Sequence, residues 1–166
     1  MDKMKNFWII LFVSLTGCSF FDRTPEETGK EGKKLPVFSL LLTDSTTYFT
    51  TRNIPSGKPV VFFYFGAHCP YSHEQMKEII DKMDELNDIR FYLVTTSSFG
   101  EMKAFCKEYA LNKYSNIIVG RDYTEFFGNY YEARGVPFLA IYRKDKRLHE
   151  AYIGKVSGGQ IKRSAG

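Results

Sequence analysis

Hydrophobic residues along the chain alternate between the spacing of strands and the spacing of helices. Continuous runs of β-branched and aromatic residues, typical of strands buried on both faces, occupy Val60–Phe65 and Ile89–Thr95. Apolar residues recur at i, i+3, i+4 and i+7 along Ser72–Leu86 and Phe99–Leu111, which predicts two amphipathic helices. This order predicts an α/β domain with a central mixed sheet flanked by helices. The remaining expected elements are a helix at Tyr123–Ala133 and strands at Val37–Leu42, Tyr48–Thr51, Asn116–Val119, Phe138–Tyr142 and Leu148–Ile153.

A β-hairpin is expected near each end of this domain. Thr43-Asp44-Ser45 is a typical turn between the first two strands, and Lys144-Asp145-Lys146 is one between the last two. The chain of 166 residues has the length of one domain, and 15 Phe with 11 Tyr can supply a sizeable core. An N-terminal β-hairpin is therefore expected at the start of the fold.

The N-terminus has the pattern of an export signal. Lys3 and Lys5 precede Phe7–Leu15, an apolar run of nine residues. A helix that crosses a bilayer needs about 20 apolar residues, so this run is too short to remain as a span. A charged start, a short apolar run and small residues after it are typical of a secretory signal, which we place at residues 1–17.

The end of this signal resembles the bacterial lipobox. Leu15-Thr16-Gly17-Cys18 has the motif in which the signal is cut before the cysteine and its thiol is acylated, with palmitate among the acyl groups. Several acyl chains on Cys18 would hold the protein on a membrane. We therefore expect a lipid-anchored domain exported to the bacterial cell envelope. An ordinary signal with a chance cysteine, or a short N-terminal anchor, are the alternatives.

Residues 18–34 are expected to be the acylated cysteine and a flexible tether. Ser19–Lys34 contains Pro25, Gly29 and Gly32, carries six charges between positions 26 and 34, and has no apolar period. Sixteen extended residues reach roughly 50 Å, enough to hold a domain away from a lipid surface. The alternative is a disordered end without a role. The folded domain is placed at residues 35–166.

Composition narrows the classes of function. The net charge is +4, but the basic residues are scattered, so no nucleic-acid partner is expected. Three cysteines are too few for a disulfide scaffold. Nothing in the sequence calls for a cofactor, and we expect a monomer. If Cys18 is acylated, Cys69 and Cys106 are the free thiols in an oxidising compartment.

The most informative segment is the stretch from residue 65 to residue 73. Cys69 lies where a buried strand ends and a helix begins, and unpaired N–H groups with the helix dipole favour a thiolate there. Pro70 suits the first helical turn. His68 and His73 could add positive charge or move protons. The alternative is a buried, inert cysteine at a strand end.

These residues resemble the thioredoxin-like superfamily. Residues 60–76, together with Gly135-Val136-Pro137, are similar to exported, membrane-attached thiol–disulfide oxidoreductases of the TlpA/ResA kind, and the likeness covers about residues 35–156. It implies that Pro137 is cis and lies against Cys69. It also implies that the Val136 backbone binds a substrate peptide, with Pro70 and Tyr71 beside it. Without the resemblance, Pro137 would be interpreted as a trans turn residue.

The sequence departs from the family pattern at three places. Ser72 replaces the second cysteine of Cys-x-x-Cys, so no local disulfide can form. His68 replaces the tryptophan that commonly precedes the cysteine. Only thirteen residues follow Ile153, and four of them are glycine, so the last helix is expected to be cut short. The departures favour monothiol exchange by Cys69 with envelope protein thiols and disulfides, with Ser72 bonding the sulfur and His68 tuning the thiolate.

Cys106 is the single candidate for an internal resolving thiol. It lies on the apolar face of its helix, where a cysteine usually packs as a small hydrophobic residue. A bridge to Cys69 would need the two Cα atoms within about 7 Å. The sequence leaves open whether Cys106 packs in the core or pairs with Cys69.

Two other functions fit the same residues. A non-catalytic thioredoxin-like module would hold an extended peptide beside Pro137 without turnover, so enzyme activity stays uncertain at this point. A copper or zinc chaperone similar to the Sco type would use Cys69, His73 and the distant His149 as ligands. The alternative is that both histidines are solvated surface residues. Our first expectation is that the protein has no metal site.

Overall fold

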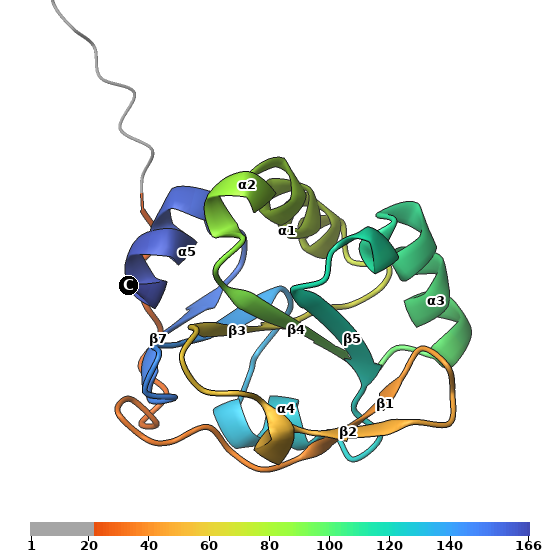
Figure 1. The fold of residues 1–166 in the computed structure, drawn as a ribbon, viewed down its shortest axis with the longest axis horizontal. Coiled ribbons are helices and arrows are strands. Elements are labelled where there is room, and N and C mark those ends of the chain that lie inside the picture. The colour runs from red at the N-terminus through yellow and green to blue at the C-terminus, as the bar shows by residue number, and fades with distance from the viewer. Residues whose placement is uncertain (1–21) are drawn as a thin grey trace, which may run out of the picture.

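The computed structural model describes residues 22–166, so the predicted signal and the cysteine predicted to be acylated lie outside the described residues. Figure 1 shows one sheet with helices on both faces. Across residues 22–166, no helix has the length and apolar character needed to cross a membrane. The strands are β1 (Ser39–Leu42), β2 (Tyr48–Thr50), β3 (Val60–Tyr64), β4 (Arg90–Thr95), β5 (Ile117–Arg121), β6 (Phe138–Tyr142) and β7 (Leu148–Ile153). The helices are α1 (Pro70–Asp81), α2 (Met83–Leu86), α3 (Phe99–Glu108), α4 (Phe126–Tyr131) and α5 (Gly158–Ala165).

The seven strands form a single mixed sheet in the order β2-β1-β5-β4-β3-β6-β7. Strands β3, β4 and β5 are parallel, whereas β1 and β6 run antiparallel to their neighbours. The pairing of β1 with β2 confirms the predicted N-terminal hairpin, and that of β6 with β7 confirms the C-terminal one. The predicted α/β architecture is therefore confirmed.

The position of β3 inside the sheet, with a core on each face, explains why its sequence is continuously apolar. Val61 and Phe63 point into the core under α1, α2, α3 and α5, whereas Val60 and Phe62 point into the core on the side of α4. Successive side chains of a strand alternate between faces, so burial on both faces needs an unbroken apolar run. The two cores hold the C-terminal end of β3, and with it the start of α1, in a fixed place.

The helix predicted at Ser72–Leu86 is in fact two helices. The chain is interrupted at Lys82, whose φ of −106° and ψ of 13° are not helical. A Cβ atom on Gly158 would lie 2.7 Å from the Lys82 Cβ, so α5 begins against this interruption. Met83 and Leu86 are still buried, which is why the apolar period runs through the break.

The last helix forms despite its glycines. Gly158 and Gly159 lie in the first turn of α5, where Ser157 caps the helix by accepting a hydrogen bond from the Gln160 amide at 3.2 Å. Ile161 and Ala165 bury the helix against the sheet. The last helix is short, as predicted, but it still forms over eight residues.

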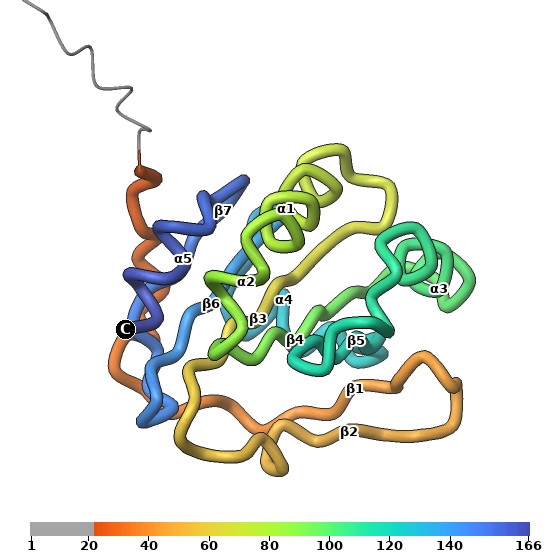
Figure 2. Tube along the Cα trace, turned by 45° about the horizontal axis from the view of Figure 1, so that its top comes forward, coloured from red at the N-terminus to blue at the C-terminus, as the bar shows by residue number. Residues whose placement is uncertain are grey.

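Residues 22–34, which we call the strap, run along the edge strand β7 (Figure 2). Backbone hydrogen bonds join the Glu26 amide to the Ala151 carbonyl at 2.8 Å and the Gly32 amide to the Leu148 carbonyl at 2.8 Å. The described part of the segment predicted as a tether is therefore hydrogen-bonded to the domain at several points. It covers the N–H and C=O groups that an edge strand otherwise leaves open.

Candidate active site

Cys69 is the N-cap residue of α1. Its φ of −78° and ψ of 117° are extended, and its carbonyl accepts the Ser72 amide at 2.9 Å and the His73 amide at 3.1 Å. Pro70 follows at the first helical position, where its missing N–H costs nothing. The side chain of Cys69 is half-buried. The structure thus places this thiol at the strand-to-helix junction that the sequence predicts.

The loop before β6 lies directly against this thiol. The Val136–Pro137 peptide bond is cis, as the family resemblance implied, and Cys69 Sγ donates to the Val136 carbonyl oxygen at 3.4 Å. A Cβ on Gly66 would lie 3.2 Å from Val136 Cγ2 and 3.4 Å from Cys69 Cβ. Gly66 therefore gives the two loops room to meet, which sequence reasoning did not foresee.

Ser72 faces the protein interior. Its side chain is fully buried, and its Oγ accepts a hydrogen bond from the Gly66 amide at 3.3 Å. Within residues 22–166 this hydroxyl has no hydrogen bond to Cys69 Sγ, so the sulfur contact expected of it is not made. The physical reason is its place on the inner side of α1, where the backbone of the active-site loop is the nearest partner.

His68 is exposed and turned toward α3. Its Nε2 lies 2.8 Å from Glu101 Oε1, and the side chain of His68 is 81% exposed. Glu101 belongs to a capping box with Ser98 at the start of α3. Hydrogen bonds from Ser98 and from His68 lower the pKa of Glu101. The Ser98-x-x-Glu101 pattern is readable in the sequence, but its pairing with His68 is not.

His73 fastens the active-site loop to α3. Its Nε2 lies 2.8 Å from the Ala67 carbonyl oxygen, which can only accept, so Nε2 carries the proton. In the neutral ring Nδ1 then accepts from the Tyr109 hydroxyl at 2.6 Å. Burial and Glu108 raise the pKa of Tyr109 to about 12, which keeps that hydroxyl protonated. Glu108 Oε1 lies 3.3 Å from His73 Nδ1.

The candidate metal ligands are not brought together. Both ring nitrogens of His73 already have partners, whereas His149 lies on β7 and pairs with Arg143 at 2.8 Å. Within residues 22–166, no group of three or more His, Cys, Asp or Glu side chains is arranged to hold a metal ion. The ligand set of Cys69, His73 and His149 is thus not assembled in this structure.

Cys106 lies in an environment different from that of Cys69. It is half-buried on α3 beside the core, and burial raises the pKa of its thiol to about 11. It lines an apolar groove with Leu42, Leu111 and Ile117. Both Cys106 and Cys69 are free thiols.

The residues expected to contact substrate lie on the two segments that meet at Cys69, the first turn of α1 and the cis-proline loop. Tyr71 is 63% exposed in the first turn of α1, and Pro70 is exposed next to it. Val136 is half-buried and Pro137 is buried. Of these residues, Val136 contacts the sulfur, through its carbonyl oxygen.

Solved structures of other proteins share this fold. A secreted disulfide oxidoreductase of Mycobacterium tuberculosis, described as homologous to E. coli DsbE, has a TM-score of 0.62 at 19% identity, over 76% of this chain and 91% of that one. A putative thiol:disulfide interchange protein DsbE from Chlorobium tepidum has a TM-score of 0.66 at 13% identity, over 81% and 94%. StoA from Bacillus subtilis has a TM-score of 0.59 at 14% identity, over 78% and 96%.

These likenesses identify the architecture as a thioredoxin-like fold, which confirms the prediction from the sequence. No curated protein matches the chain. The family model described as Redoxin matches residues 30–162, which include the junction at Cys69, the cis Val136–Pro137 bond and all seven strands. The protein is therefore a member of the Redoxin family.

Proposed function

We propose that the protein is a lipid-anchored, exported thiol–disulfide exchange protein in which Cys69 acts as a single thiol on cell-envelope proteins. The observation that carries the proposal is the position of the Cys69 sulfur. It lies at the N-terminus of α1, half-buried, 3.4 Å from the Val136 carbonyl oxygen of the cis-proline loop. The positive end of a helix stabilises a thiolate, and the thiolate is the nucleophile in disulfide exchange.

The exchange needs no electron source beyond the thiols themselves. The Cys69 thiolate attacks one sulfur of a client disulfide, a new S–S bond forms between Cys69 and the client, and the other client sulfur leaves as a thiolate. A second thiolate, from the client or from a small thiol, then attacks the client sulfur and releases Cys69. The client disulfide is rearranged or transferred, and Cys69 returns to its starting state.

Ser72 explains why the proposed reaction is exchange rather than ordinary dithiol reduction. In Cys-x-x-Cys sites the second cysteine resolves the mixed disulfide from within the protein. Here a buried hydroxyl occupies that position and bonds the Gly66 amide. A mixed disulfide on Cys69 therefore persists until an outside thiol attacks it.

The proposed location comes from the sequence. Residues 1–17 have the pattern of a secretory signal, and Leu15-Thr16-Gly17-Cys18 resembles the lipobox. One of the structures that shares the fold is described as secreted. An anchored domain in the envelope space would meet proteins that acquire disulfides there.

Trapping of a mixed disulfide tests the catalytic proposal. Purified protein is incubated with scrambled ribonuclease, and adducts are separated by non-reducing electrophoresis and located by mass spectrometry. Cys69→Ala should give no adduct, and Cys106→Ala is the matched control that should form adducts at the rate of the parent protein. Adducts that survive in Cys69→Ala would contradict the proposal. Retention of an extended peptide with no covalent adduct would instead support the non-catalytic binding module.

A further inference from the structure

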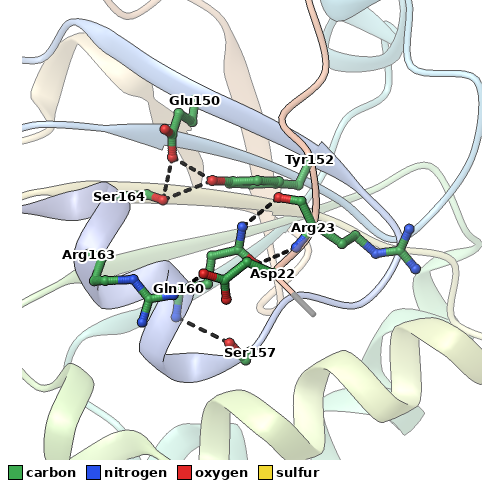
Figure 3. Close-up of polar contacts among 8 residues, drawn as sticks. All are labelled: Asp22, Arg23, Glu150, Tyr152, Ser157, Gln160, Arg163 and Ser164. Carbon is green, nitrogen blue, oxygen red and sulfur yellow. Dashed lines mark hydrogen bonds and ion pairs between the residues drawn. The ribbon is translucent and has the colours of Figure 1, made fainter. Parts of the chain in front are cut away.

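The strap is fastened to α5 from its first described residues (Figure 3). Arg163 Nη2 donates to Asp22 Oδ2 at 2.5 Å. The side-chain amide of Gln160 accepts from the Arg23 amide at 2.9 Å and donates to the Arg23 carbonyl at 2.7 Å. Gln160 is 6% exposed, so its paired hydrogen bonds hold the strap more firmly than the exposed ion pair does.

The loop between β7 and α5 is shaped to receive Arg23. Its Nε donates to the Lys155 carbonyl at 2.9 Å, and its guanidinium lies over Gly154. A Cβ on Gly154 would be 2.7 Å from that guanidinium, and the φ of Gly154 is +83°, so this position favours glycine on both counts. From here the strap continues along β7 through the Glu26 amide. The strap is therefore packed against the domain and hydrogen-bonded to it.

This attachment limits how far the domain can move from Cys18. Four peptide steps separate Cys18 from Asp22, and an extended chain spans at most about 3.6 Å per residue, or about 14 Å in all. We propose that α5 and the strap form the membrane-facing side of the domain, and that Cys69 opens away from the lipid surface. The inference rests on the acylation of Cys18 that is part of the proposed function.

The length of α1 separates Cys69 from the place where α1 meets α5. Gly158 at the start of α5 donates its amide to Glu78 Oε1 at 2.8 Å and packs against Lys82, so α5 meets the C-terminal end of α1. Figures 1 and 2 both show α2 between α1 and α5. Cys69 caps the other end of the 12-residue helix, about 18 Å away along its axis.

The α5 side of the domain carries both basic and acidic side chains. The last turn of α5 carries Lys162 and Arg163, and Arg23 and Lys155 lie on the same side. Asp88 and Asp22 pair with Lys162 and Arg163, so the surface is charged but close to balanced. A balanced surface is neither strongly attracted to anionic headgroups nor repelled by them, so the short link to the acyl chains is what holds this side at the membrane.

Fluorescence quenching in vesicles tests the orientation. Full-length acylated protein is reconstituted in phosphatidylcholine vesicles with one quarter phosphatidylglycerol and a headgroup-attached quencher. One protein carries a single fluorophore on Cys69 in the Cys106→Ser background. The other carries it at Lys162→Cys in the Cys69→Ser, Cys106→Ser background. We expect quenching at position 162 to be several-fold stronger than at position 69.

A lengthened link is the control for this experiment. Twelve glycine and serine residues inserted between positions 21 and 22 leave the strap intact but free the domain, and should reduce quenching at position 162 toward that at position 69. Equal quenching at both positions in the acylated parent protein would overturn the orientation and leave the exchange proposal untouched. An N-terminal peptide without acyl mass would overturn the anchor and this inference together, whatever the activity of Cys69.

Discussion

The start of α1 and the C-terminal part of α3 each carry one half-buried cysteine, and the two thiols differ in their position along the helix and in their partners. Cys69 is the N-cap residue of its helix and faces the loop of the cis proline. Cys106 lies within the last two turns of α3, away from any helix N-terminus, and burial raises the pKa of its thiol to about 11. In the proposed function the first thiol is the nucleophile, and the second packs beside the core.

Because both residues are cysteines, the difference between them comes from where each lies along its helix and from its neighbours. At a helix N-terminus, unpaired N–H groups and the helix dipole both favour a negatively charged group. Inside the helix the amides bond the preceding turn, and an apolar neighbourhood such as Leu111 and Ile117 disfavours any charge. In the proposed function, Cys69 is therefore the reacting thiol, and Cys106 packs in its groove.

The largest expected effect is the loss of Cys69. Cys69→Ala should reduce mixed-disulfide formation with scrambled ribonuclease to the background of the buffer, because no other thiol in the domain lies at a helix N-terminus. Adduct yield on non-reducing gels measures it. Cys106→Val, of similar volume and without a thiol, should keep the parent yield, and an equal loss in that variant would erase the distinction between the two cysteines.

The next largest effect is a gain of insulin-reducing activity. Ser72→Cys restores a second thiol one helical turn after Cys69, so the variant should reduce insulin catalytically with dithiothreitol where the parent protein is close to background. Turbidity of precipitating insulin B chain gives the rate. Ser72→Ala is the matched control, because it removes the hydroxyl without adding a thiol. A variant as inactive as the parent would show that Ser72 is not what limits the site to exchange.

A smaller effect is expected where α3 holds the active-site loop. His73→Phe keeps a ring at this position but loses the bonds to the Ala67 carbonyl and the Tyr109 hydroxyl. A hydrogen bond is worth about 1 kcal/mol net, so mixed-disulfide formation should slow by roughly fivefold for each bond lost. Tyr109→Phe removes one of these bonds and should fall between His73→Phe and the parent protein. Rates at or above the parent value in both variants would contradict this role.

The smallest effect is expected at the exposed pair of His68 and Glu101. Glu101→Gln keeps a side chain that suits the capping box but removes the charge, and exposed ion pairs contribute little. The rate of Cys69 alkylation should change by less than about threefold. The lowered pKa of Glu101 means that its contribution to folding is present above its unfolded pKa and is lost as pH falls through its folded pKa. A tenfold change in the alkylation rate at pH 7 would assign this carboxylate a direct influence on the sulfur.

The parts of the structure that were predictable are those encoded locally. The apolar run at Val60–Phe65 predicts a strand buried on both faces, and a cysteine followed by Pro70 predicts the junction where the helix begins. The cis Val136–Pro137 bond was expected only through the family resemblance, because cis bonds are rare on sequence grounds alone.

The parts that were missed depend on contacts between distant segments. The break at Lys82 reflects the approach of Gly158, which lies 76 residues further along the chain. The strap has no apolar period, and its attachment uses backbone groups and the side chain of Gln160, 137 residues from Arg23. The role of His73 likewise depends on Tyr109, whose sequence pattern indicates only a core-facing residue.

The most direct measurement is the alkylation of the native, reduced protein by iodoacetamide at pH 7, followed with time by peptide mass spectrometry. The account predicts that the peptide with Cys69 is modified well before the peptide with Cys106, and that Cys106 reacts at a comparable rate only after unfolding or at strongly alkaline pH. Modification of Cys106 ahead of Cys69 in the folded protein, or no reaction at Cys69, would contradict it.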